Sequence, residues 1–281
     1  MINSEPPLWI IAPLPEDLVL WQLPWCEAAE GKISVNRSKF TNLEMAEVIV
    51  DAMPLCLSRL TATEVGRKLT AGKIETFLCD LPSSSEEAIG ITPGDNLASA
   101  RHIHEINRRL LLLGQLVGES LSATRTVWLP SGKLVDFPWF RQAAGQYIGG
   151  GAFPALLRTT VTEVRTGHFV TRGLDYFAGQ EIRLTTSQDC DLAAASRHLV
   201  RIIEDITTNG KIVTPGLSEG CTQGETLIYT PSDDLAHVDV SIAIDAVNAE
   251  WASLQPQTKP RWAPLRGRSD RRARQIARNC R

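Results

Sequence analysis

The chain has 281 residues, of which 43% are hydrophobic and 22% are charged, and its formal net charge is −3. This composition excludes a wholly disordered chain, a collagen-like chain and a small disulfide-stapled domain. The charge is unevenly distributed, because residues 259–281 contain nine basic side chains and one acidic one. Residues 1–258 therefore carry about −11 and residues 259–281 about +8. The sequence predicts an acidic body followed by a basic tail.

The N-terminal segment predicts neither a signal peptide nor a membrane anchor. No basic residue precedes its short apolar run, and four prolines interrupt it: Pro6, Pro7, Pro13 and Pro15. No later segment reaches the roughly 18 apolar residues that a spanning helix needs. The six cysteines form no Cys-x-x-Cys pair, which is typical of reduced thiols: Cys26, Cys56, Cys79, Cys190, Cys221 and Cys280. We therefore expect a cytoplasmic protein that does not contact membranes.

The first 130 residues predict short strands around helices. β-branched and aromatic residues between turn formers indicate strands at 8–12, 47–53, 74–79 and 124–129. Thr61 and Glu64 fit a capping box, which predicts a helix to about Ala71 with Gly72 as its left-handed stop. Residues 81–95 are rich in Ser, Pro and Gly, so we expect a loop there.

Two long amphipathic helices are the strongest periodic signals. In the first, apolar residues recur every three or four positions: Ile103, Ile106, Leu110, Leu113 and Val117. The second is expected at 189–208, with Ser187 as its N-cap and Asn209-Gly210 as its end. Each pattern predicts one buried face.

The second half of the chain predicts further strands and turns. We expect strands at 155–164, 181–185 and 225–230, and a strand followed by a helix at 238–249. A short helix at 137–147 should end at Gly149–Gly151, while 173–179 and 216–224 should form a compact turn and a polar glycine loop.

These elements predict an α+β fold, with largely antiparallel sheet and the two long amphipathic helices packed on one face. Residues 1–258 are expected to form one α+β unit. The segments of about 30–130 and 131–250 have a similar order of elements, which suggests two similar modules. Residues 259–281 are expected to form a basic, partly disordered tail.

One segment carries a family resemblance. Residues 171–182 read Thr-Arg-Gly-Leu-Asp-Tyr-Phe-Ala-Gly-Gln-Glu-Ile. This resembles the bacterial domain of unknown function 4261 (DUF4261) family, whose signature is Thr-x-Gly-Leu, an aromatic-Gly element and a Glu-led strand. The matching residues are Thr171, Gly173, Leu174, Phe177, Gly179 and Glu181, with one additional residue between Phe177 and Gly179. The similarity is best over 171–230 and extends over roughly 95–232. It implies a bacterial cytoplasmic α+β protein with no established activity and no catalytic residues to transfer.

The segment His102-Ile-His104-Glu105 is the best candidate for metal binding. On a helix, however, His102 and His104 would point about 200° apart, so they could not bind one ion together. His102 and Glu105 could share a face, but two ligands do not make a tight site. We therefore expect no metal site and no cofactor.

Other polar and aromatic clusters also have simple structural interpretations. Cys190 lies at a predicted helix start between Asp189 and Asp191, which oppose a thiolate and complement the helix dipole. The glycine-rich segments 145–151 and 216–224 lack a phosphate-loop motif and indicate turns. One further group is interpreted as an exposed acidic loop: His237, Asp233, Asp234 and Asp239. Another group is interpreted as core or near-core aromatic residues: Trp128, Trp139, Tyr147 and Phe153.

The basic tail is the one extended polar feature that implies a partner. Its candidate binding residues are Arg266, Arg268, Arg271, Arg272, Arg274 and Arg278. Such a segment can neutralise phosphates, but the acidic body would repel nucleic acid. Docking on the acidic face of the same chain, or on an acidic protein, is therefore favoured over nucleic-acid binding.

The sequence thus favours a non-enzymatic factor of the immunity or accessory type that binds another protein. No predicted cluster unites a nucleophile, a base and an orienting group. Two alternatives remain open. One is a hydrolase or transferase whose site is assembled only in the fold, and the other is nucleic-acid association through the tail. A deep pocket around His102, Glu105 or His237 would favour an enzyme, whereas a shallow acidic surface would favour a protein partner.

Overall fold

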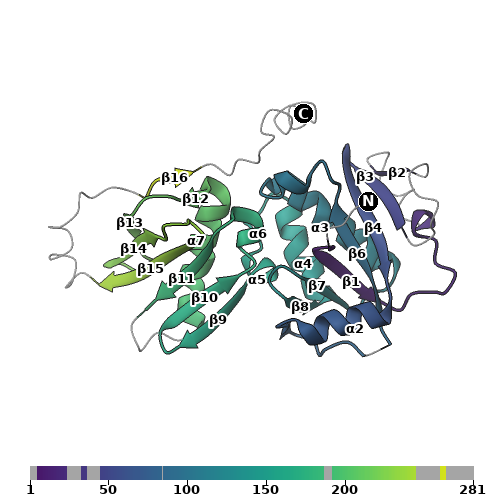
Figure 1. Ribbon diagram of the computed structural model, residues 1–281, viewed down its shortest axis with the longest axis horizontal. Helices are drawn as coiled ribbons and strands as arrows, with labels where there is room; N and C mark the ends of the chain where they lie inside the picture. Colours follow the sequence, from purple (N-terminus) through teal and green to yellow (C-terminus); the bar gives the residue numbers. More distant parts are fainter. Residues whose placement is uncertain are drawn as a thin grey trace. The chain divides into compact units, whose positions relative to one another are not determined.

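The computed structural model describes residues 5–23, 33–36, 45–83, 85–186, 192–244 and 260–263. The described chain forms two compact units, unit 1 within Met1–Leu157 and unit 2 within Arg158–Leu265 (Figure 1). Each unit combines a sheet with helices, so the predicted α+β class is confirmed.

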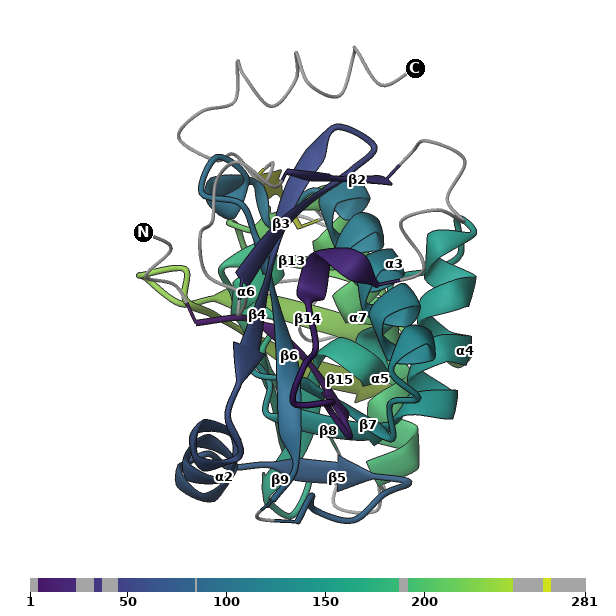
Figure 2. The ribbon, with the colours of Figure 1, turned by 90° about the vertical axis from the view of Figure 1, so that its right-hand side faces the viewer.

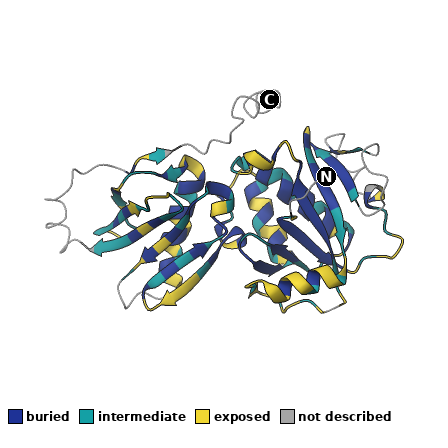
Figure 3. Cartoon of the chain, viewed as in Figure 1, coloured by how far each residue is buried: buried dark blue, intermediate teal, exposed yellow. Residues whose placement is uncertain are grey.

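Unit 1 is built on an eight-stranded sheet with the order β2-β3-β4-β6-β1-β7-β8-β5. Only the pairing of β5 with β8 is parallel; the other neighbours are antiparallel. The strands are β1 (Leu8–Ala12), β2 (Ile33–Asn36), β3 (Met45–Val50), β4 (Met53–Leu60), β5 (Glu75–Phe77), β6 (Glu87–Pro93), β7 (Arg125–Trp128) and β8 (Lys133–Asp136). Its central strands are the most buried part of the unit (Figure 3).

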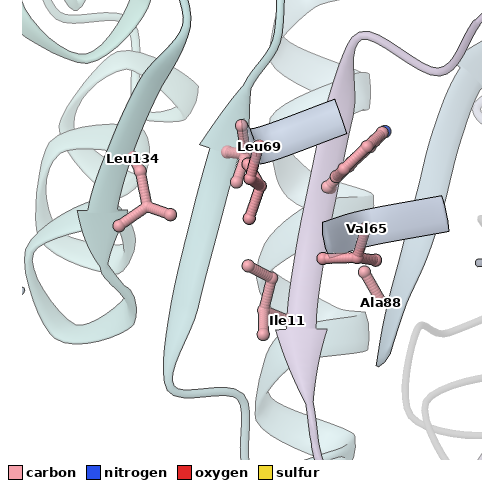
Figure 4. Close-up of a cluster of buried hydrophobic side chains, with 7 residues drawn as sticks. Ile11, Val65, Leu69, Ala88 and Leu134 are labelled. Carbon is pink, nitrogen blue, oxygen red and sulfur yellow. The ribbon is translucent and has the colours of Figure 1, made fainter. Parts of the chain in front are cut away.

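Helices cover both faces of this sheet. The long helix α3 (His104–Ser120) packs beside α4 (Phe137–Ile148) (Figure 2). A side chain at Gly114 of α3 would meet Leu8 and Ile10 of β1, so α3 lies close to that face. On the opposite face, Val65 and Leu69 of α2 (Ala62–Ala71) pack against a cluster that includes Ile11 (Figure 4). Two single 3-10 turns complete the unit: η1 (Leu20–Gln22) and η2 (Ala98–Ala100).

The predicted start of α2 is confirmed, and its predicted end is wrong in one detail. Thr61 and Glu64 form the reciprocal capping box, in which each side chain accepts a backbone N–H of the other residue. Gly72 does follow Ala71, but its φ of −85° and ψ of 153° are extended rather than left-handed.

The loop predicted at 81–95 is wrong over much of its length. Residues 87–93 form β6, which pairs with both β4 and β1 in the middle of the sheet. Ala88, Ile89 and Ile91 are fully buried. A side chain at Gly90 would come within 2.7 Å of the Pro6 ring, so this glycine permits close packing. The turn-like composition therefore belongs to the flanks of a strand.

The strand predicted at 47–53 spans a hairpin instead. Asp51 and Ala52 have φ values of 45° and 64°, and they form the two-residue turn between β3 and β4. Two residues with positive φ suit the twist of a tight hairpin. Neither residue is the usual Asn or Gly, which is why the sequence did not reveal the turn or β4.

Unit 2 contains a six-stranded sheet with the order β13-β14-β15-β11-β10-β9 and a two-stranded sheet of β12 and β16. The strands β11 and β15 are parallel. The strands are β9 (Thr160–Arg165), β10 (His168–Arg172), β11 (Glu181–Thr185), β12 (Lys211–Ile212), β13 (Gly216–Glu219), β14 (Glu225–Pro231), β15 (His237–Ile244) and β16 (Trp262–Ala263). The helices of unit 2 are α6 (Asp175–Ala178) and α7 (Leu192–Asn209), and the short α5 (Ala155–Arg158) spans the boundary between the two units in the sequence.

Several predictions in unit 2 need correction. The expected strand at 155–164 begins as the helical turn α5 and continues as β9. The expected loop at 216–224 contains β13, and the compact turn at 173–179 contains α6 with Gly179 in the left-handed region. Within the segment expected to be a tail, Trp262 and Ala263 form β16 and pair with β12. The helix expected after β15 and the N-cap Ser187 lie outside the described residues.

Two glycines in helices provide a matched test of this packing. An alanine methyl group at Gly66 of α2 would meet nothing within 4 Å, whereas at Gly118 of α3 it would lie 2.0 Å from a ring carbon of Phe137. We expect Gly66→Ala to raise the free energy of unfolding by about 0.5–1 kcal/mol, because alanine favours helix. Gly118→Ala should lower it by about 1–3 kcal/mol through overpacking. Urea denaturation measures both, and equal effects of the two substitutions would contradict the packing.

Candidate functional site

Unit 1 carries an open cleft of 720 Å³. Its lining residues come from the segment 16–19, from the first turns of α2 and from the adjoining ends of β4 and β6. Its charged lining residues are Glu16, Asp17, Arg59, Glu64, Arg67 and Glu87. This volume lies within the range of small-molecule and peptide sites.

Arg59 connects two of the segments that line the cleft. Its Nη2 donates to Glu87 Oε2 at 2.7 Å, and its Nη1 donates to the backbone oxygen of Pro15 at 3.2 Å. Nε also reaches Glu87 Oε1 at 3.4 Å, so the pairing is bidentate. Arg59 thereby connects the sheet to the chain that leads into the segment 16–19, and its positive charge is offset by Glu87.

The remaining charge of the cleft is acidic. Four carboxylates and two guanidinium groups line it. Hydrogen bonds from the backbone and side chain of Thr61 lower the pKa of Glu64, so this carboxylate is ionised at neutral pH. Because Arg59 is already paired with Glu87 and the charge of Arg67 acts on Glu64, the excess of negative charge comes from Glu16 and Asp17. An open site of this character suits a cationic ligand or a basic polypeptide segment.

The predicted cluster His102-Ile-His104-Glu105 lies elsewhere in unit 1. His102 precedes α3, which begins at His104, so the helical angle between the two histidines does not apply. His104 Nδ1 lies 2.7 Å from the hydroxyl of Tyr147 on α4. Glu105 forms ion pairs with Arg108 and Arg109 at 3.3 and 2.7 Å. The histidine and the carboxylate therefore bind different partners.

The aromatic residues are core or near-core, as the sequence indicated. Trp128, Tyr147 and Phe153 are buried, whereas Trp139 is half-buried. His104, Tyr147 and Phe153 form mutual ring contacts with centroid distances of 5.8–6.2 Å. This group joins the start of α3 to the end of α4.

The residues that carry the family resemblance form a structural latch in unit 2. The carboxylate of Glu181 accepts hydrogen bonds from Thr171 Oγ1 at 2.6 Å, from Gly173 N–H at 2.6 Å and from Asp175 N–H at 3.1 Å. Thr171 Oγ1 in turn accepts the N–H of Ile182 at 2.8 Å. These bonds tie β10, β11 and the start of α6 together, so the motif explains local structure rather than chemistry.

A histidine–carboxylate pair that the sequence did not reveal also lies in unit 2. His198 of α7 is 6% exposed, and its Nε2 lies 3.6 Å from Glu225 Oε2 on β14. Burial lowers the pKa of His198, although the charge of Glu225 opposes this. Burial alone would raise the pKa of Glu225, but hydrogen bonds from Thr222 outweigh it and lower the pKa. The partners are 27 positions apart in the sequence, so no local pattern indicated the pair.

The remaining predicted positions form turns or lie outside the described residues. Ser232 and Asp234 make the turn before β15, and His237 N–H donates to Ser232 Oγ at 3.0 Å. Residues 149–151 close the end of α4 through backbone hydrogen bonds. Other candidates lie outside the described part of the chain: Asp189, Cys190, Asp191, Arg266, Arg268, Arg271, Arg272, Arg274 and Arg278.

Among the described residues, no group of three or more His, Cys, Asp or Glu side chains is arranged to hold a metal ion. In the same part of the chain, no helix combines the length and apolar character needed to cross a bilayer. Of the described cysteines, Cys56 is buried, Cys79 is half-buried and Cys221 is exposed, and they form no disulfide bond with one another.

Comparisons with known proteins returned no relatives. No family model matches the chain, and no curated protein and no solved structure matches it significantly. The DUF4261 resemblance therefore stays a prediction.

The latch around Glu181 gives a testable effect on stability. Burial raises the pKa of Glu181, against the hydrogen bonds that it accepts. The folded state therefore binds this proton more tightly than the unfolded state does, and stability falls as the pH rises through the folded pKa. Glu181→Gln should remove this loss. Its free energy of unfolding should therefore increase relative to that of the wild type as the pH rises from 4.5 to 7.5. Glu181→Ala should be less stable than Glu181→Gln by about 2–3 kcal/mol at every pH, because the donors of Thr171 and Gly173 lose their acceptor. Similar stability of the two variants would contradict the latch.

His198 predicts a pH dependence of the opposite sign. Because burial lowers its pKa in the fold, the unfolded chain binds the proton more tightly than the folded chain. The contribution of His198 to the free energy of unfolding should therefore be complete above about pH 6.5, the pKa of an exposed histidine, and should decline as the pH falls below it. Between pH 7.5 and 5.5 the wild type should lose more stability than His198→Gln. Parallel pH profiles of the two proteins in urea denaturation would show that His198 is not the titrating group.

Proposed function

We propose that the protein is a non-enzymatic factor, of the immunity or accessory type, that binds another protein. We further propose that the acidic cleft of unit 1 receives a basic segment of that partner. The observation that carries this proposal is the open, acidic character of the cleft, where four carboxylates against two guanidinium groups leave an excess of negative charge at Glu16 and Asp17. A polypeptide with Lys or Arg side chains is complementary to such a surface.

A hydrolase or transferase is the alternative that the sequence left open. An enzyme needs a nucleophile, a base and an orienting group beside a space for substrate. No described histidine lines the cleft, and two of them, His104 with Tyr147 and His198 with Glu225, pair with residues that also lie outside it. Both pairs have a partly or fully buried imidazole, and each connects two secondary-structure elements. The geometry therefore favours binding.

Nucleic-acid association through the basic tail is the other alternative. The acidic charge of residues 1–258 disfavours it. A full-length variant with glutamine at all six candidate arginines separates this alternative from protein binding, because it leaves the folded units and β16 intact. The substituted positions are Arg266, Arg268, Arg271, Arg272, Arg274 and Arg278. Retention on nucleic acid across a salt series should be as weak for the wild type as for this variant. A large, salt-sensitive difference would favour nucleic-acid binding instead.

The cleft can be tested with a defined basic peptide. We expect a synthetic peptide with the sequence of residues 264–281 to bind the six-glutamine variant, which has no competing basic tail of its own. Binding should weaken about five- to tenfold in Glu16→Gln/Asp17→Asn, because these charges lie in the cleft and face solvent. Fluorescence anisotropy at low and high salt measures the affinity.

The matched control for this experiment is Asp233→Asn/Glu219→Gln, which removes two exposed carboxylates from unit 2. This control should bind the peptide as the parent does. Equal weakening by both pairs of substitutions would mean that only the net charge matters, and the cleft would not be the binding site.

A further inference from the structure

Residues 264–281, which we call the arginine segment, carry a charge opposite to that of the cleft. The arginine segment contains seven arginines and one acidic residue, so its formal net charge is +6. The cleft is lined by four carboxylates and two guanidinium groups, and its excess of negative charge lies at Glu16 and Asp17. Basic polypeptide is the kind of ligand that such a site suits. The chain therefore contains, in its own sequence, a segment that is complementary in charge to its cleft.

Glu16 and Asp17 remain available to a cationic segment. Both residues are exposed, and in the described part of the chain neither carboxylate forms a hydrogen bond or an ion pair. The other two carboxylates are engaged, because Glu87 binds Arg59 and Glu64 caps α2. Adjacent unpaired charges in a concave site concentrate the electrostatic field there. They direct a cationic segment to the cleft rather than to the acidic surface in general.

The strand β16 anchors the start of the arginine segment to the fold. Trp262 and Ala263 pair with β12, and Val213 N–H donates to Arg261 O at 2.8 Å. Arg261 N–H in turn donates to Thr214 Oγ1 at 2.9 Å. The arginine segment therefore leaves the folded chain from a fixed point, as a tethered ligand does.

Tethering makes a weak attraction sufficient. The 18 residues after Ala263 span at most about 60 Å when extended. A globular unit of the size of unit 1 has a radius of gyration of about 15 Å, so the segment is long enough to reach across one. A tether of this kind gives an effective concentration of about 1 mM. A segment with a dissociation constant of about 100 μM then occupies about nine clefts in ten.

We propose that the arginine segment of the same chain occupies the cleft and competes there with the basic segment of the partner protein. This inference rests on the proposed function, because it assigns the occupant that the same cleft holds before the partner binds. At micromolar protein concentration, the tethered segment outcompetes the same segment of another molecule. The protein therefore stays monomeric while its cleft is occupied.

Occupancy by the arginine segment sets a threshold for the partner. When nine clefts in ten hold the segment, the apparent affinity of a competing basic polypeptide falls about tenfold. A partner then needs affinity from contacts that charge alone does not supply. Leu18 and Val19 follow the two free carboxylates in the sequence and also line the cleft, so they offer apolar contacts. The partner's segment therefore combines basic with apolar side chains.

The affinity for an added peptide measures the occupancy. At low salt, a labelled peptide with the sequence of residues 264–281 should bind the wild type about tenfold more weakly than it binds the six-glutamine variant, as measured by fluorescence anisotropy. The difference should shrink as salt is added, because screening releases the segment from the cleft.

A charge-matched control separates occupancy from net charge. Arg271→Gln/Arg272→Gln/Arg274→Gln should raise the affinity for the peptide about three- to fivefold, since the weakened segment leaves the cleft more often.

The control removes the same number of positive charges from exposed positions in unit 2: Arg165→Gln/Arg183→Gln/Arg197→Gln. This control should bind the peptide as the wild type does. An equal gain in both triple variants would overturn the proposal, because net charge alone would then explain it.

A double-mutant cycle tests whether the arginine segment and the cleft act on each other. In the Glu16→Gln/Asp17→Asn background, the six-glutamine substitution should raise the affinity for the peptide at most about twofold, because the segment has lost its site. An undiminished, about tenfold effect in this background would overturn the proposal.

The remaining outcomes separate this inference from the proposed function. Equal affinity of the wild type and the six-glutamine variant, with both weakened by Glu16→Gln/Asp17→Asn, would overturn the inference and leave the cleft as a site for basic polypeptides. Binding to the six-glutamine variant that ignores Glu16→Gln/Asp17→Asn would overturn both. In sedimentation equilibrium, a molar mass that rises with concentration only for the wild type would place the segment in the cleft of a second copy and overturn the assignment to the same chain.

Discussion

The burial of β1 on both faces is the constraint on which unit 1 depends. Every residue of Leu8–Ala12 is at most 2% exposed, and neighbouring strands pair with both of its edges. A strand without an exposed face needs helices on both sides of its sheet. The second face requires α2, and α2 begins at the capping box of Thr61 and Glu64, beside the ends of β4 and β6. The acidic cleft is thus formed where the covering helix meets the sheet.

The same constraint accounts for the two ends of α2. At its start, Glu64 serves the helix cap and also contributes negative charge to the cleft. After its end, the chain turns back to add β5 as the outer, parallel strand beside β8. The connection is short and leaves Phe77, Leu78 and Leu81 on the outside of the sheet. The cleft and these exposed apolar side chains are therefore consequences of how one helix is connected to the sheet that it covers.

Local signals predicted those elements whose stabilising contacts are close in sequence. The capping box of α2 and the apolar stripe of α3 are of this kind, and both are present. The strand β6 was missed because it is buried on both faces and does not alternate, and because Gly90 serves contact with the distant Pro6. The candidate site had no local signal, since Glu16, Arg59 and Glu87 converge from three separate segments. His198 and Glu225 likewise meet only through the packing of α7 on the sheet.

The most direct test of a protein-binding cleft is to locate where a basic peptide contacts the folded chain. Backbone amide NMR spectra of the isotope-labelled full-length six-glutamine variant can be followed during titration with the peptide of sequence 264–281. We predict chemical-shift changes concentrated at residues 16–19 and at the first turns of α2, with an amplitude that falls as salt is added. Changes spread evenly over the acidic surface, or concentrated in unit 2, would contradict binding in the cleft.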